Sequence, residues 1–108
     1  MDIMQGDSYP VYITLTQDGQ PLTPNMLYEL EVCVSTHLRK LYTTGEVLYD
    51  SENSRWYIRL TQEETLGLPT GVHSVICRIK YLSTDEADVK GVCVGTIKVY
   101  DTFSEEVL

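Results

Sequence analysis

Alanine is almost missing from this 108-residue chain, which contains only Ala87, whereas tyrosine occurs eight times. Branched and aromatic side chains pack well on a pleated surface, so this bias favours strands over helices. With 43% hydrophobic residues, the chain can bury a core, which excludes wholesale disorder. The length suits one domain. We expect residues 1–100 to form a single β domain and residues 101–108 an acidic tail.

Basic residues are also scarce, with 8 against 16 acidic residues and a net charge of −8. A nucleic-acid binder needs a basic patch, and the only close basic pair is Arg39-Lys40. The acidity likewise argues against an anionic membrane surface, and no apolar run is long enough to span a bilayer. Residues 1–7 lack the basic and apolar regions of a signal peptide. We therefore predict no nucleic-acid partner and no membrane partner.

Cysteine is limited to Cys33, Cys77 and Cys93, an odd number without a Cys-x-x-Cys pair. A disulfide framework is not indicated by these long spacings. Each cysteine lies in an apolar, strand-like run, which predicts three buried or half-buried free thiols in a reducing compartment. One cross-strand disulfide is the alternative.

Histidine occurs only as His37 and His73, and neither has a nearby Cys or His that would complete a metal site. His73 and Cys77 share a face of a regular strand, but they lie two pleats apart, too far for a direct hydrogen bond. The tetrapeptide at 85–88, Asp-Glu-Ala-Asp, has no phosphate-binding loop with it and is expected to be a solvated turn. We predict no catalytic, cofactor-binding or metal-binding residues, and hence no enzyme and no cofactor.

Alternation of apolar and polar residues is the strongest signal in the chain, and it predicts strands. Glu29 and Glu31 share one strand face, which predicts that this face is wet. Asp18-Gly19 predicts a hairpin turn, and Gly91 and Gly95 predict a bulge or a close backbone approach in the last strand. The expected strands cover parts of 9–16, 29–34, 47–49, 56–60, 72–82 and 89–100, with a short edge strand in 1–7.

The segment from Trp56 to Gly71 is predicted to organise the fold. Trp56 is expected in the core, where its large area contributes most. Thr61 and Glu64 fit a capping box, so a short helical turn is predicted near 62–67, ended by Gly67 in a left-handed conformation. About seven strands with this one turn predict an all-β, immunoglobulin-like antiparallel β-sandwich, with a small barrel as the alternative.

Several of these motifs together resemble a known family. They are Gly6-Asp7-Ser8-Tyr9-Pro10, the run Thr16 to Leu22 with Asp18-Gly19 and Pro21-Leu22, Leu60-Thr61-x-Glu63-Glu64-Thr65, Leu68-Pro69-Thr70-Gly71, and Gly95-Thr96-Ile97-Lys98-Val99. In this order they resemble small immunoglobulin-like domains encoded by phages and prophages of Gram-positive bacteria, such as the N-terminal domain of baseplate upper proteins. The resemblance covers about Gly6 to Tyr100.

The resemblance implies a non-enzymatic virion structural protein at a tail, baseplate or fibre, acting in protein–protein interaction. Its partners would be other phage structural proteins or further copies of itself. It would be located in the bacterial cytoplasm before assembly and in the virion afterwards. Baseplate proteins continue into a long helical or fibre-like extension, which residues 101–108 do not resemble, so head-associated and accessory roles are equally open.

Two further functions are compatible with the sequence. A carbohydrate-binding β-sandwich module is the main alternative, since exposed Trp or Tyr rings can stack on sugars. The five tyrosines that could lie at outward or edge positions are Tyr12, Tyr28, Tyr42, Tyr49 and Tyr57. A small hydrolase that uses Cys77 or Cys93 is the third hypothesis.

Overall fold

The computed structural model describes residues 1–82, 89–103 and 106–108. The tetrapeptide at 85–88 and residues 104 and 105 of the acidic tail lie outside these ranges. Within them, strands dominate and only two short helical turns occur, so the expectation of an all-β protein is confirmed. The elements are β1 (Asp2–Met4), β2 (Tyr9–Ile13), β3 (Thr16–Gln17), β4 (Gln20–Pro21), η1 (Pro24–Met26), β5 (Leu27–Val34), β6 (Leu38–Leu41), β7 (Val47–Asp50), β8 (Arg55–Leu60), α1 (Gln62–Leu66), β9 (Gly71–Tyr81) and β10 (Val89–Tyr100).

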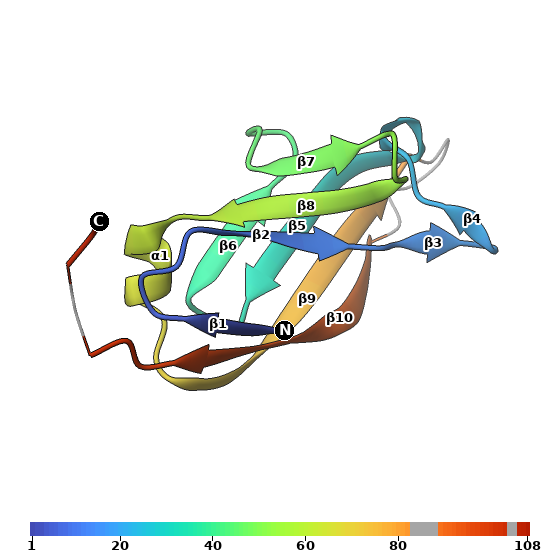
Figure 1. Cartoon of the computed structure of the whole chain (residues 1–108). Coiled ribbons are helices and arrows are strands. Elements are labelled where there is room, and N and C mark those ends of the chain that lie inside the picture. The colour runs from blue at the N-terminus through green and yellow to red at the C-terminus, as the bar shows by residue number, and fades with distance from the viewer. Residues whose placement is uncertain (83–88, 104–105) are drawn as a thin grey trace.

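Two main sheets hold most of the strands (Figure 1). The five-stranded sheet has the order β1-β10-β9-β5-β6, and the three-stranded sheet has the order β2-β8-β7. A small hairpin, β3-β4, stands apart from both. The described chain has ten strands rather than about seven, because β1, β3 and β4 are very short. Neighbours are antiparallel except for β1, which runs parallel to β10.

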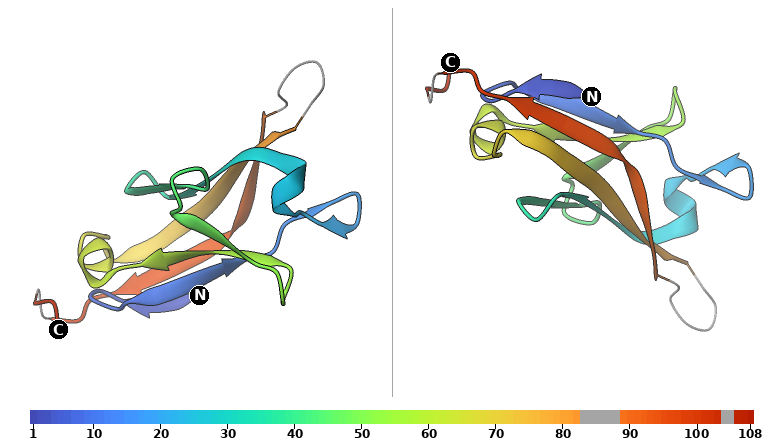
Figure 2. Two further views of the ribbon diagram at one scale, coloured as in Figure 1. Left: turned by 90° about the horizontal axis from the view of Figure 1, so that it is seen from above. Right: turned by 90° about the horizontal axis from the view of Figure 1, so that it is seen from below.

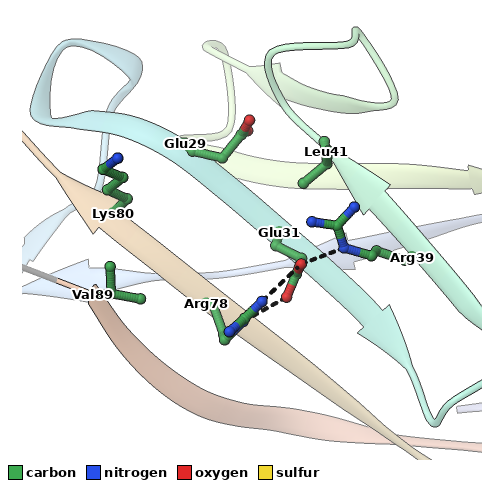
Figure 3. A pocket seen from close by; sticks show the side chains of 7 residues that line it. All are labelled: Glu29, Glu31, Arg39, Leu41, Arg78, Lys80 and Val89. Carbon is green, nitrogen blue, oxygen red and sulfur yellow. Dashed lines mark hydrogen bonds and ion pairs between the residues drawn. The ribbon is translucent and has the colours of Figure 1, made fainter.

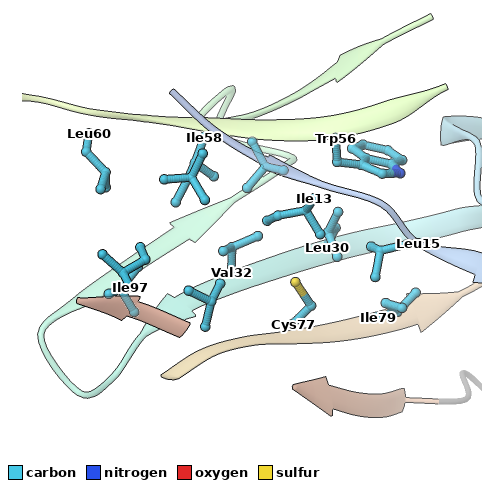
Figure 4. Close-up of a cluster of buried hydrophobic side chains, with 14 of the residues drawn as sticks. Ile13, Leu15, Leu30, Val32, Trp56, Ile58, Leu60, Cys77, Ile79 and Ile97 are labelled. Atoms are coloured by element: carbon cyan, nitrogen blue, oxygen red, sulfur yellow. The ribbon is translucent and has the colours of Figure 1, made fainter. Parts of the chain in front are cut away.

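The core lies between the two main sheets, where alternate residues of each sheet point toward the other (Figure 4). Trp56 of β8 is fully buried at 0% exposure, as predicted. Its indole Nε1 donates a hydrogen bond to the Leu22 carbonyl oxygen at 2.9 Å, so the polar end of the ring is satisfied. The rings of Tyr42 and Tyr49 pack against the same indole.

The predicted helical turn is present as α1, and its capping box is complete. Thr61 Oγ1 accepts a hydrogen bond from the Glu64 N–H at 3.2 Å, and Glu64 Oε1 accepts one from the Thr61 N–H at 3.0 Å. The left-handed conformation expected at Gly67 is wrong, because φ there is −79° and its N–H still bonds back to Glu63 O. Gly71, with φ of +118°, carries the unusual backbone conformation instead.

The two predicted backbone irregularities are present. Asp18 and Gly19 both have positive φ, as the tight hairpin turn between β3 and β4 requires. In β10 the register shifts between Cys93 and Gly95, which is a β-bulge. Gly91 keeps the regular register opposite Arg78 and forms no bulge.

The three cysteines are free thiols, but they do not share one environment. Cys77 is buried and Cys33 is half-buried, as expected. Cys93 is exposed, so that part of the expectation is wrong. It stands across Ile76 on the face of the five-stranded sheet that points away from the core. Separately, none of the helices in the described ranges is long and apolar enough to cross a membrane.

Candidate functional site

Charged side chains of three neighbouring strands lie close together on the outer face of the five-stranded sheet (Figure 3). Alternation along β5 turns Glu29 and Glu31 outward, while β9 contributes Arg78 and Lys80 and the edge strand β6 contributes Arg39. The register sets Glu31 directly opposite Arg78. Opposite charges on neighbouring strands of one face are thereby brought together.

Glu31 is held between the two arginines, and we call Glu31, Arg39 and Arg78 the arginine clamp. Arg78 donates from Nε to Glu31 Oε1 at 2.6 Å and from a terminal nitrogen to Oε2 at 3.1 Å. Arg39 Nε donates to Oε2 at 2.5 Å. The Glu31 side chain is only 7% exposed, whereas those of Arg39 and Arg78 are 61% and 59% exposed.

The clamp fixes the charge of its carboxylate. Hydrogen bonds from Arg78 lower the pKa of Glu31 to about 2, against the opposing effect of burial and with further help from Arg39. Glu31 is thus a buried anion on a face that the sequence predicted to be wet, so that prediction is wrong for this residue. Two long guanidinium side chains, rather than water, cover its carboxylate.

A shallow hollow surrounds the clamp and extends toward β10 and the edge strand β6. Its lining comprises Glu29, Glu31, Arg39, Leu41, Arg78, Lys80 and Val89. Glu29 accepts hydrogen bonds from the backbone N–H of Thr43 and of Leu30, both at 3.0 Å. Burial works to raise its pKa, but the Thr43 bonds outweigh this effect and lower it. Both carboxylates in the hollow are therefore occupied, while the arginines present exposed N–H groups to a partner.

Apolar side chains lie on the same face beside the clamp. Val72 and Ile76 of β9 and Val89 of β10 are exposed to solvent. Ile76 stands between Cys33 and Cys93 in one cross-strand row. Arginine is enriched in protein–protein interfaces, and apolar groups are common at their centres.

The outer face of the three-stranded sheet carries a second cluster, built on tyrosine. The rings of Tyr12 and Tyr57 lie 5.7 Å apart, and the Arg55 guanidinium covers the Tyr12 ring at 3.7 Å. Tyr12 and Tyr28 are exposed, in line with the outward placement expected from the sequence.

The other predicted aromatic positions differ. Tyr42 and Tyr49 pack toward the core and are not outward, although Tyr49 lies on the edge strand β7, which is one of the two expected placements. The buried Trp56 cannot stack on a sugar, which removes the residue on which the carbohydrate alternative most depended.

The two histidines, which sequence spacing kept apart, meet in space with ring centroids 5.5 Å apart. His73 is buried, and its Nε2 donates to the Pro69 carbonyl oxygen at 2.7 Å, so its ring is not directed at Cys77. Burial raises the pKa of the Cys77 thiol to about 12, the reverse of what a nucleophile needs. Within the described ranges, no three His, Cys, Asp or Glu side chains gather in a way that could hold a metal ion.

Comparison with known proteins gave no further guidance: no protein family, no curated protein and no solved structure matches this chain.

Proposed function

We propose that this chain is a non-enzymatic structural or assembly protein of a phage or prophage, associated with a tail, baseplate or fibre, and that it works as a protein–protein interaction module. Its docking surface is the outer face of the five-stranded sheet. The observation that carries the proposal is the arginine clamp with exposed Val72, Ile76 and Val89 beside it.

The strand order supports the immunoglobulin-like part of the proposal. In a variable-type immunoglobulin domain, strands G, F, C and C′ are neighbours in one sheet and B, E and D in the other. Here β10, β9, β5 and β6 are neighbours, and so are β2, β8 and β7, with matching chain order. The helical turn α1 joins β8 to β9, the equivalents of strands E and F.

The core departs from that of antibody domains in two respects. Antibody domains bury a tryptophan on strand C against a disulfide between strands B and F. This chain buries Trp56 on β8, and Cys77 of β9 is a free thiol. The proposal is therefore an immunoglobulin-like order with a core of its own, in keeping with the phage-domain resemblance of Gly6 to Tyr100.

The rigidity of the clamp supports a docking role. Arg39 and Arg78 are long side chains that would lose much rotamer freedom on binding. Their bonds to Glu31 already order them in the unbound protein, so a partner would find donors in fixed positions. An acidic or carbonyl-rich partner surface is the complement of these donors.

Gene neighbourhood and binding together test the proposal. Tail or capsid genes beside the coding gene are expected, and metabolic genes there would contradict it. Each neighbouring structural protein is then co-expressed with this chain, and its binding is measured for the wild type, for Ile76→Glu on the outer face and for Tyr12→Glu on the opposite sheet. We expect Ile76→Glu to abolish binding and Tyr12→Glu to preserve it. Wild-type protein that binds none of these proteins and stays monomeric at high concentration would refute the proposal.

A further inference from the structure

The two histidine rings meet where the turn between β5 and β6 lies against the first residues of β9. His37 belongs to that turn and His73 to β9, and their ring centroids are 5.5 Å apart. The turn is fixed against β9, because the Ser35 N–H donates to the Ser74 carbonyl oxygen at 2.8 Å. Figure 2 shows that β9 begins at the end of the molecule where α1 lies. The ring contact therefore joins two segments whose backbones already hold each other in place.

His73 uses one of its two ring nitrogens to hold its own position. The residue is only 7% exposed, and its Nε2 lies 2.7 Å from the Pro69 carbonyl oxygen. A carbonyl oxygen can only accept a hydrogen bond, so Nε2 carries the proton in this contact. In the neutral ring, Nδ1 therefore carries the lone pair.

That lone pair on His73 Nδ1 is not used by the protein. Among the described residues, Nδ1 has no hydrogen-bond partner. It reaches solvent all the same, because every fully buried side-chain nitrogen or oxygen in the described ranges has a partner. An imidazole that donates one N–H to a backbone carbonyl and keeps its other nitrogen available is in the state that metal-binding histidines adopt.

His37 supplies a second available imidazole beside the first. Its side chain is exposed, and within the described part of the chain neither of its ring nitrogens has a hydrogen-bond partner. An exposed side chain changes rotamer in picoseconds to nanoseconds, so the His37 ring can turn toward an ion without disturbing the core. Edge-to-face packing would explain the contact of the two rings, but it does not explain why His73 Nδ1 lacks a partner.

The separation of the rings fits two ligands of one ion. Two imidazoles bonded at about 2.0–2.1 Å to one tetrahedral ion have ring centres roughly 5 Å apart. The two histidine rings, at 5.5 Å, are close to this separation before any adjustment. A small rotation of His37 is therefore sufficient, while His73 stays in place on its bond to Pro69.

We propose that His37 and His73 together bind a divalent transition-metal ion, and that zinc is the ion they take. Imidazole nitrogen suits zinc, copper and nickel, whereas magnesium and calcium prefer oxygen ligands. His73 binds through Nδ1 and His37 through the ring nitrogen that turns toward it, and water completes the coordination. The ion ties the β5–β6 turn to β9. This site goes beyond the proposed function and uses none of the residues of the arginine clamp.

Nuclear magnetic resonance of the histidine ring nitrogens tests the assignment atom by atom. The ¹⁵N-labelled chain is freed of metal with a chelator and then titrated with Zn²⁺. We expect Nδ1 of His73 and one ring nitrogen of His37 to shift with the same midpoint, while Nε2 of His73 keeps its proton. Shifts at His37 alone, or no shift at either ring, would overturn the proposal.

Calorimetry with Zn²⁺ assigns the affinity to the pair. His37→Ala should weaken binding by about tenfold or more, since loss of even an outer partner of a metal ligand costs about 10–100-fold. Thr36→Ala, an exposed position in the same turn, is the matched control and should bind as the wild type does. Cys93→Ser should also bind unchanged, which separates the site from the exposed thiol. Equal affinity of the wild type and His37→Ala, or loss of binding in Cys93→Ser, would overturn the proposal.

Thermal unfolding gives an independent readout. An ion that binds the folded chain raises its unfolding midpoint, so Zn²⁺ should raise that of the wild type and of Thr36→Ala, and Mg²⁺ should not. His37→Ala should lose most of the rise, and a rise that it keeps in full would contradict the assignment. His37 is exposed, so its substitution leaves folding intact. The Ile76→Glu binding test involves neither histidine, so the two proposals can fail separately.

Discussion

We expect substitution of Glu64 to destabilise the fold, because its carboxylate stabilises two elements at once. Its Oε1 accepts the Thr61 N–H at 3.0 Å and caps α1, while its Oε2 pairs with Lys40 Nζ at 2.5 Å. Lys40 lies on β6 opposite buried Val32, and its side chain is only 11% exposed, against 24% for Glu64. Glu64 therefore holds α1 onto the edge of the five-stranded sheet.

The Glu64→Ala variant should lower the free energy of unfolding by about 1.5–3 kcal/mol. Loss of the reciprocal cap costs about 0.5–1 kcal/mol, by the scale of N-cap substitutions. Leaving the Lys40 ammonium without its partner adds about 1–2 kcal/mol, less than the full penalty for a deeply buried pair because Glu64 is partly exposed.

Equilibrium urea denaturation at pH 7 measures these differences, with unchanged m-values as the check on comparable unfolding. Glu64→Gln keeps an oxygen for the cap and loses only the charge, so it should cost less than Glu64→Ala. Thr61→Ala loses one hydroxyl bond and should cost about 1 kcal/mol. Lys40→Met combined with Glu64→Gln should cost less than the sum of the single changes, because no unpaired charge remains. Equal costs for Thr61→Ala and Glu64→Ala would refute the dual role.

Three further outcomes are expected. Glu31→Gln should lower the free energy of unfolding by about 1–2 kcal/mol at pH 7, because it breaks the ion pairs of the arginine clamp. The cost stays modest because both arginines are largely exposed to solvent. The pKa of Glu31 in the folded protein, about 2, lies below the ordinary value of 4.5. The stability difference between wild type and Glu31→Gln is therefore fully present above pH 4.5 and should shrink as the pH falls toward 2. A stability difference that stays constant from about pH 7 to 2.5 would contradict the clamp. A maleimide should label Cys93 in the folded protein and Cys77 only on unfolding; rapid labelling of Cys77 would contradict its buried, raised-pKa thiol. Trp56→Phe should cost about 2 kcal/mol by thermal unfolding, because the bond to Leu22 O and part of the packing are lost; a cost under 0.5 kcal/mol would argue against that bond.

Local signals in the sequence predicted local structure well. The period-two alternation located the long strands, the Thr61 and Glu64 spacing located α1, and Asp18-Gly19 located the hairpin turn. Each of these signals depends on residues that are close together in the chain, so it can be recognised before the fold is known. The burial of Trp56 followed from its size alone.

The failures share a different cause, which is that the decisive partners come from distant strands. Glu31 lies 47 residues from Arg78, so its burial under guanidinium groups could not be read from its wet-looking face. His37 and His73 meet only because β5 and β9 are neighbours. The exposure of Cys93 depends on which face of β10 points outward. The bulge after Cys93 changes whether odd-numbered or even-numbered residues lie on that face. A cross-strand charge pair could have been guessed only from the register.

The parallel pairing of β1 with β10 has a mechanical consequence. Both strands run the same way, so a force that separates the two ends of the chain pulls β1 backward and β10 forward. The bonds from Lys98 N–H to Met1 O and from Gln5 N–H to Tyr100 O, each 2.8 Å, then bear the load together in shear instead of opening one after another. We expect the β1–β10 pair to resist a force along the strands far better than a force that peels β1 away from the side.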